Sequence, residues 1–183
     1  MMDKIIQHNF KTIKPQSIFV TDVVDPVMNE DIVKVIRKSG DKQDYKTNVK
    51  AYMTDWDISN KPGFKQLTKH IISITKYLSE KYYHRKDTKL RIDNMWGMIY
   101  KRDEYAMVHD HWPSIWSGVY YINVPDNGGS DLYFPQLKTS LSPKENQMII
   151  FDGYLRHGVK PNKSNKERIA VSFNVKEAFQ NRS

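Results

Sequence analysis

The sequence predicts a mainly β fold, a β-sandwich or jelly-roll barrel backed by N-terminal helices. Two observations predict this class. Apolar residues recur at helical spacing mainly before residue 88, and from Lys89 onward they fall in short runs, many of them alternating with polar residues, that polar turns separate. Because no helical pattern alternates with the later runs, a doubly wound α/β sheet is unlikely. We predict a single domain over 1–183, in which 1–88 supports a barrel formed by 89–176.

Two helices are expected in the first half. An apolar run at 18–24 predicts a strand, which Asp25-Pro26 ends. Asn29 is the expected N-cap of a helix that stops near Ser39. Pro62-Gly63 opens the longest helical pattern, whose apolar positions share one face: Phe64, Leu67, Ile71, Ile74, Leu78 and Tyr82.

The second half reads as strands. After an extended stretch at 49–56, strands are predicted at 90–100, 116–124, 131–134, 147–151, 158–160 and 168–175. The last of them alternates completely, with one face made of Ile169, Val171, Phe173 and Val175 and the other of Arg168, Ala170, Ser172 and Asn174. We expect helices on the apolar face and the barrel interior on the polar face. Inside a barrel an arginine needs an anionic partner.

Composition narrows the chemistry. The chain has no cysteine, which excludes disulfides, thiolate-bound metals and thiol nucleophiles. Its 29 Lys and Arg against 21 Asp and Glu give a net charge of +8, which attracts anions, but the lysines are dispersed as on a solvated surface. Residues 1–10 lack the pattern of a signal peptide, and no apolar run is long enough to cross a membrane. We therefore expect a cytoplasmic location.

Three histidines indicate a metal site. In an extended segment His109 and His111 project to the same side while Asp110 points away, and His157 from a later strand would complete the set. Neutral imidazoles suit iron, copper, nickel or zinc. A dicarboxylate that reaches from this metal to Arg168 would supply the missing anion through a bidentate pair.

Other polar side chains are candidates for the same carboxylate. Ser172 follows Arg168 on the polar face of its strand and can donate a hydrogen bond. In the strand at 116–124, alternation places Tyr120 on the same face as Trp116, from where it could contact the carboxylate. Tyr100 is the last residue of the strand at 90–100.

The region from Tyr105 to Val175 resembles the 2-oxoglutarate- and Fe(II)-dependent oxygenases, especially members found in bacteria and their viruses. Three segments carry the resemblance: VHDHWPSIWSGVYYINVPDNGG, MIIFDGYLRHGVKP and ERIAVSFNV. The resemblance implies a double-stranded β-helix, or jelly roll, with supporting N-terminal helices. It also implies a hydroxylase that uses Fe(II), 2-oxoglutarate and O2, and that can use ascorbate, in the cytoplasm of a bacterium or a virus-infected host cell.

The resemblance also implies roles for individual residues. His109 and His157 would ligate iron, and Arg168 would hold the C5 carboxylate of 2-oxoglutarate. Tyr120 matches a tyrosine that some prolyl-hydroxylase-like members use for the same carboxylate.

The chain departs from the family at the middle ligand. Two residues after the first histidine the family usually has a carboxylate, whereas this chain has His111, with Asp110 one place early. Three outcomes stay open: His111 ligates, Asp110 ligates through a bend, or water holds the position. We favour His111, because spacing decides which side chains converge. Three neutral histidines leave the charge of Fe(II) to be neutralised by the 2-oxoglutarate dianion.

The substrate is the least determined feature. Similarity to prolyl-hydroxylase-like members favours a peptidyl side chain such as proline, while an amino acid, a small metabolite and a nucleic-acid base stay open. Trp116 and Asn174 are the predicted substrate contacts, and four more aromatic residues are expected near the mouth of the barrel: Trp112, Tyr121, Tyr133 and Tyr154.

Two other functional classes stay open. A cupin-like three-histidine dioxygenase that works without 2-oxoglutarate would not need Arg168. A non-catalytic jelly-roll binding module would not bind stoichiometric iron. The sequence indicates no oligomeric state.

Overall fold

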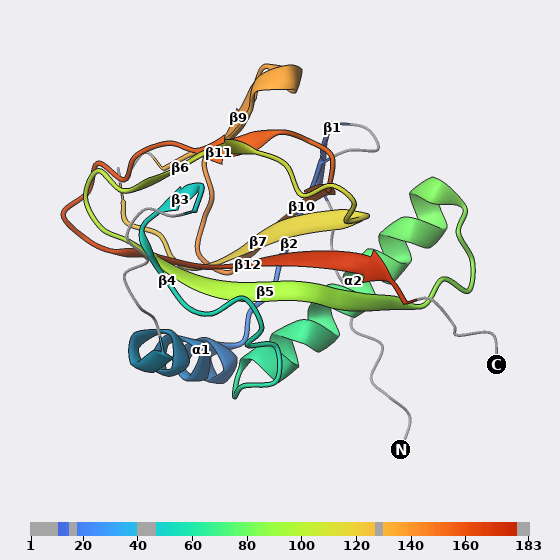
Figure 1. Ribbon diagram of the computed structural model, residues 1–183, viewed down its shortest axis with the longest axis horizontal. Helices are drawn as coiled ribbons and strands as arrows, with labels where there is room; N and C mark the ends of the chain where they lie inside the picture. Colours follow the sequence, from blue (N-terminus) through green and yellow to red (C-terminus); the bar gives the residue numbers. More distant parts are fainter. Residues whose placement is uncertain (1–10, 15–17, 40–46, 127–129, 179–183) are drawn as a thin grey trace.

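The computed structural model describes residues 11–14, 18–39, 47–126 and 130–178, whose strands form two antiparallel sheets (Figure 1). The seven-stranded sheet has the order β1 (Lys11–Lys14), β2 (Ile18–Asp22), β10 (Gln147–Asp152), β7 (Trp116–Asn123), β12 (Arg168–Glu177), β5 (Leu90–Tyr100) and β4 (Tyr52–Met53). The five-stranded sheet has the order β3 (Val49–Lys50), β6 (Tyr105–His109), β11 (His157–Val159), β8 (Leu132–Phe134) and β9 (Thr139–Leu141). The predicted mainly β jelly-roll class is confirmed.

Both helices lie on the outer face of the larger sheet (Figure 1). Helices α1 (Pro26–Ser39) and α2 (Phe64–Tyr83) share one hydrophobic core with the apolar face of β12, as the sequence predicted. A second core fills the space between the sheets and includes Trp96, Met98, Tyr100 and Tyr121. Elements from the first half therefore complete the core of the second half.

The start of α1 differs from the prediction. The helix begins at Pro26 rather than after Asn29, and the side chain of Asp25 accepts a hydrogen bond from the backbone N–H of Met28 at 2.9 Å. Asp25 is therefore the N-cap, and proline is well suited to the first helical position because its missing N–H would have no partner there. The Asn29 side chain instead donates to the side chain of Asn146.

The predicted strands correspond to observed ones with small shifts at their ends, but β1, β6 and β9 were not predicted. These strands are three to five residues long. β6 is exposed at Tyr105 and Met107 and buried between them at Ala106, and its pairing with β11 gives it a place in the sheet. Between β8 and β9, Pro135–Leu137 form one turn of 3-10 helix.

The register of β12 decides which side chains enter the barrel. Arg168 pairs with Tyr100, and Ser172 pairs with Trp96 on β5 and with Val119 on β7. Residues directly opposite each other in an antiparallel pair lie on the same face. The polar row of β12 therefore shares the interior with alternate residues of both neighbouring strands.

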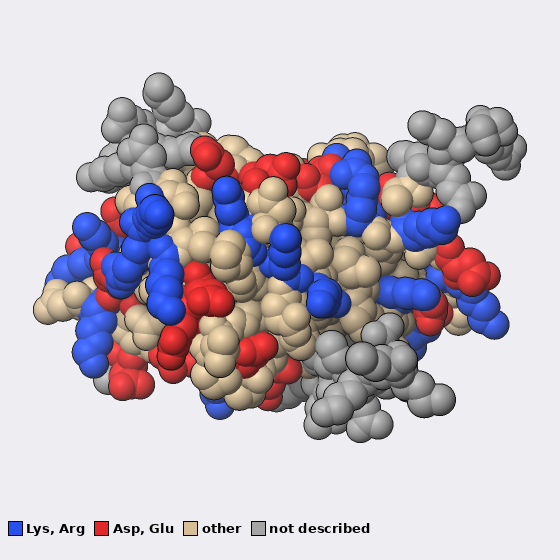
Figure 2. Space-filling view, turned by 90° about the horizontal axis from the view of Figure 1, so that it is seen from below, with Lys and Arg blue, Asp and Glu red and all other residues tan. Residues whose placement is uncertain are grey.

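Positive and negative side chains interleave on the face seen in Figure 2. Within the helices, Lys34 lies 3.9 Å from Glu30, and Lys76 lies 3.9 Å from Glu80. No helix in the described part of the chain is both long and apolar enough to span a bilayer. The sequence-based expectation about residues 1–10 lies outside the described residues.

Candidate active site

Three histidines meet between β6 and β11. His109 ends β6, His111 follows it by two residues, and His157 begins β11 directly opposite His109. Their ligand nitrogens all lie within 4.8 Å of one another. His157 is buried and the other two are partly exposed, so the cluster lies at one end of the barrel interior, where one metal ion can contact all three.

Two of these histidines are held in the orientation that metal binding requires. His109 donates from Nδ1 to the carbonyl of Met107 at 2.7 Å, and His157 donates from Nδ1 to the carbonyl of Leu155 at 2.9 Å. Because a carbonyl only accepts, both rings carry their proton on Nδ1 and leave Nε2 free for a metal.

Burial keeps the cluster neutral. Desolvation lowers the pKa of all three side chains. The pKa of His157 lies well below its usual value, and the pKa of His111 falls to about 3. Neutral imidazole is the form that ligates metal, so the three side chains fit an iron ion at neutral pH.

The geometry favours His111 over Asp110 as the middle ligand. The Asp110 side chain is exposed and accepts a hydrogen bond from the backbone N–H of Trp112 at 3.2 Å, away from the cluster. His111 donates its backbone N–H to the carbonyl of Gly153 at 2.8 Å, which ties its loop to the segment before His157.

Asn174 lies beside His111, and other protein side chains hold its amide group. Its Nδ2 is 3.4 Å from His111 Nδ1 and donates to the side chain of Asn94 at 2.7 Å. Its Oδ1 accepts from the hydroxyl of Ser117. Both polar atoms of the amide thus have side-chain partners, and the predicted contact of Asn174 with a substrate stays a prediction.

Arg168 is buried at the other end of the interior, with 1% of its surface exposed. Its Nη1 donates to the carbonyl of Ser130 at 2.7 Å, and its guanidinium carbon lies 4.1 Å from the centroid of the Tyr100 ring. None of the described carboxylates forms an ion pair with it. A buried cation without a counter-charge is costly, so this end of the barrel suits an anionic ligand.

Unpartnered polar atoms surround the guanidinium. Among the described residues, Arg168 Nε, the hydroxyl of Tyr121 and the hydroxyl of Ser130 are buried without a hydrogen-bond partner. Burial raises the pKa of Tyr121, and it raises that of Tyr100 to about 12, so both phenols stay protonated. A carboxylate that reaches these donors can accept from them.

Tyr120 is not one of these donors, so its predicted role is wrong. It pairs with Val171 on the helix side of the sheet, and its hydroxyl contacts the carbonyl of Val23 and the side chain of Asn29, each at 2.8 Å. The neighbouring Tyr121 faces the interior, 6.0 Å from its ring centroid to the guanidinium carbon of Arg168. The sequence correctly placed Tyr120 and Tyr121 on opposite faces of β7. Only the register of β7 against β12 shows which of the two faces lies inside.

Trp116 lies on the same outer face, so it does not contact a substrate in the barrel. Its Nε1 donates to the hydroxyl of Ser79 on α2 at 2.8 Å. Its ring packs against Phe19 and Tyr83, with centroid separations of 5.9 and 5.1 Å. Trp116 is a core residue between the sheet and the helix.

The remaining predicted residues lie around the histidines. Ser172 lines the interior close to the cluster, and Tyr133 packs over Gly158 beside His157. Trp112, 76% exposed, directly follows His111, and the exposed Tyr154 follows Gly153. Trp96, which sequence reasoning missed, lies 5.9 Å from His111 between the ring centroids. Its alternation with Met98 and Tyr100 on β5 was the signal available.

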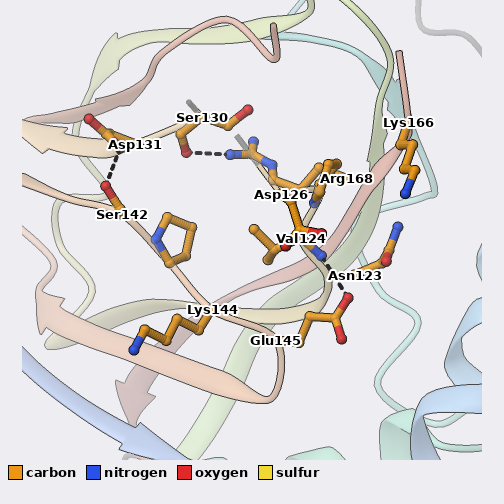
Figure 3. A pocket seen from close by; sticks show the side chains of 12 residues that line it. Asn123, Val124, Asp126, Ser130, Asp131, Ser142, Lys144, Glu145, Lys166 and Arg168 are labelled. Atoms are coloured by element: carbon orange, nitrogen blue, oxygen red, sulfur yellow. Dashed lines mark hydrogen bonds between the residues drawn. The ribbon is translucent and has the colours of Figure 1, made fainter. Parts of the chain in front are cut away.

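Two cavities adjoin these residues. A cavity of about 20 Å³ lies among the histidines, Trp96 and Ser172. At the other end a cavity of about 790 Å³ opens beside Arg168, and Figure 3 shows the guanidinium directed at Ser130 in its wall. The interior between them is filled by side chains, so a ligand joining the two ends must displace some of them.

Comparisons with known proteins agree with this arrangement. A family model described as "Putative 2OG-Fe(II) oxygenase" matches residues 134–174, which include His157 and Arg168. No curated protein matches the chain in sequence.

Three solved structures share the fold. The viral collagen prolyl hydroxylase of Paramecium bursaria Chlorella virus-1, in complex with 2-oxoglutarate, has a TM-score of 0.66 at 20% identity over 89% of this chain and 97% of its own. A prolyl-4-hydroxylase of Pseudomonas putida has a TM-score of 0.67 at 11% identity, covering 89% and 94%. HygX of Streptomyces hygroscopicus, with nickel, 2-oxoglutarate and hygromycin B bound, has a TM-score of 0.69 at 10% identity, covering 89% and 84%.

The family match, over residues 134–174, agrees with the predicted superfamily of 2-oxoglutarate- and Fe(II)-dependent oxygenases. The match likewise agrees with the predicted class of enzyme and its use of Fe(II), 2-oxoglutarate and O2. The individual site residues stay predictions, and they rest on the geometry described above.

The first prediction ranks the ligands. His109→Ala, His157→Ala and His111→Ala should each weaken iron binding by about a hundredfold or more, because each removes a ligand, whereas Asp110→Ala should change it little. Iron stoichiometry and competition with a chelator measure this, and circular dichroism checks folding. A larger loss in Asp110→Ala than in His111→Ala would move the middle ligand to Asp110.

The second prediction concerns pH. In the metal-free protein the free energy of unfolding should fall as the pH drops from 7 to 5, because unfolded histidines take up protons below about pH 6.5 and the buried, neutral ones do not. Urea denaturation at both pH values measures the slope. Burial also lowers the pKa of His70, so this residue makes the free energy of unfolding fall with pH in the same direction. The slope of the unmodified protein is therefore compared with that of His111→Leu, which should be smaller. An equal slope in that variant contradicts a neutral, buried His111.

Proposed function

We propose that the chain is an Fe(II)- and 2-oxoglutarate-dependent dioxygenase that hydroxylates a peptidyl side chain such as proline, in the cytoplasm of a bacterium or a virus-infected host cell. One observation carries the enzymatic part. A neutral three-histidine cluster and a buried arginine without a carboxylate partner lie at opposite ends of one barrel interior. A dicarboxylate that also binds metal satisfies both ends.

The histidines would hold Fe(II) through imidazole nitrogens. Three protein ligands leave the other coordination positions open for the cosubstrate and O2. Their neutrality leaves the charge of the ion for a dianion to offset. When bound, the iron would supply the activation of O2 that is coupled to oxidation of 2-oxoglutarate.

The other end of the interior would bind the distal carboxylate. Arg168 supplies charge and a planar pair of donors, and Tyr121 and Ser130 supply hydroxyl groups. Stacking on Tyr100 holds the guanidinium plane in place.

Apolar rings exclude water beside the metal end. Phe151 lies 4.5 Å and Phe134 6.1 Å from the His157 ring, between centroids. A dry environment strengthens the charge interactions of a bound cosubstrate and limits side reactions. These residues therefore position and shield the ligand without taking part in the chemistry.

The mouth supports a peptide substrate. Trp112 and Tyr154 are exposed on the two loops that the hydrogen bond between His111 and Gly153 joins. Aromatic side chains of this kind form grooves for proline-rich peptides, whose extended conformation is already ordered. Two of the proteins that share the fold are prolyl hydroxylases, and HygX, crystallised with hygromycin B, keeps a small molecule as the second candidate.

A three-histidine dioxygenase without 2-oxoglutarate explains less. It accounts for the metal cluster but gives no partner to Arg168 or to the two unpartnered hydroxyl groups beside it. A non-catalytic binding module also gives Arg168 no partner. It does not explain why His109 and His157 are oriented with Nε2 free.

The third prediction tests the function directly. Adding 2-oxoglutarate to the Fe(II)-loaded protein without oxygen should produce a charge-transfer band in the visible spectrum, since the keto acid chelates the iron. Succinate is the control, because it lacks the keto group and should produce no band. A protein that binds iron and shows no band with 2-oxoglutarate does not use this cosubstrate.

The fourth prediction separates the two tyrosines. Arg168→Ala should weaken 2-oxoglutarate binding at least a hundredfold while iron still binds, and Arg168→Lys should recover part of it. Tyr121→Phe should weaken it about tenfold, because one hydrogen bond to a charged group is lost. Tyr120→Phe is the matched control: it should lower stability and leave the affinity unchanged. Titration of the Fe(II) protein without oxygen measures all four, and equal effects of the two tyrosine variants would disprove the assignment.

A further inference from the structure

We propose that Trp96 binds the carboxylate of 2-oxoglutarate at the metal end of the barrel, through a hydrogen bond from its indole N–H. The inference rests on the proposed function and adds a cosubstrate-binding residue to it.

Trp96 is a buried donor beside the histidines. Only 2% of its surface is exposed, and it lines the same small cavity as His109, His111 and His157. Its Nε1 has no hydrogen-bond partner in the described part of the chain. Buried indole N–H groups normally find an acceptor, so an unpartnered one in a ligand cavity points to an acceptor on the ligand.

The position of Trp96 along β5 identifies the end of the ligand that it meets. It precedes Tyr100 by four residues, about 13 Å along an extended strand, and Tyr100 stacks on Arg168. Its ring instead lies 5.9 Å from that of His111. The interior therefore has unpartnered donors at both ends, and the two carboxylates of 2-oxoglutarate supply an acceptor for each.

The indole is held in place before a ligand arrives. Trp56 packs against it with 4.8 Å between ring centroids, and Ser172 lies opposite it on β12. A donor fixed in this way loses little freedom when it binds. Trp56 itself is 43% exposed and does not line the small cavity, which makes it a matched control.

The test measures binding to the Mn(II)-loaded protein without oxygen, so that no turnover occurs. Trp96→Phe keeps an aromatic ring and removes the N–H. It should weaken 2-oxoglutarate about tenfold, equivalent to about 1.4 kcal/mol, and leave Mn(II) affinity unchanged. Trp56→Phe should change neither affinity. Equal weakening in both tryptophan variants, or none in Trp96→Phe, would overturn the inference.

Oxalate locates the contact, because it chelates metal and lacks the distal carboxylate. Trp96→Phe should weaken oxalate and 2-oxoglutarate by the same factor, whereas Arg168→Ala should weaken only 2-oxoglutarate. If Trp96→Phe leaves oxalate affinity unchanged, the indole does not bind the metal end. If the unmodified protein binds Mn(II) but not 2-oxoglutarate, the proposed function fails as well.

Nuclear magnetic resonance gives a readout that does not depend on the variant folding. In the Zn(II)-loaded protein the chain has four indole N–H signals, from Trp56, Trp96, Trp112 and Trp116. Adding oxalate should move the Trp96 signal downfield, as a new hydrogen bond to a carboxylate does. Replacing the other three tryptophans in turn identifies it if Trp96→Phe does not fold. A Trp96 signal that keeps its position when oxalate binds would overturn the inference.

Discussion

A buried arginine charge is the constraint on which the rest of this site depends. Arg168 is buried between the sheets, and its described partners are the backbone carbonyl of Ser130 and the rings of Tyr100 and Tyr121. These dipoles offset part of the cost of taking the charge out of water, and an anion is needed for the remainder. The donors around it, from Tyr121 and Ser130, are arranged for a group with several acceptor atoms. These donors support the proposal that a carboxylate binds here.

Helix packing and ligand binding are linked through β12. Its apolar face is one wall of the core beneath α1 and α2, and its polar face is one wall of the barrel interior. Covering the first face with helices forces the second inward, because successive side chains of a strand alternate. Stability and function thus come from the same ten-residue strand. The interior of the barrel is also tightly packed, so its side chains must move when a ligand joins its two ends.

The three-histidine cluster changes the charge of the metal end. A carboxylate in the middle position would bring its own negative charge, whereas His111 brings none. In the proposed site an iron ion would be balanced by what binds to it, which would favour a dianionic cosubstrate. The unpartnered indole of Trp96 adds a neutral donor at the same end. The proposed cosubstrate would thereby meet donors of the protein at both ends of the interior.

The sequence by itself determined the order of helices and strands, the two faces of β12 and the spacing of the histidines, because these depend on local periodicity. It also carried the resemblance with which the family match over residues 134–174 agrees. It did not determine the short strand β6, since pairing with β11 gives that strand its place. Nor did it distinguish Tyr120 from Tyr121, or show that Trp116 packs on a helix while Trp96 lines the cavity. Alternation defines two faces for each strand, but only the register between strands and the packing of the helices decide which face lies inside.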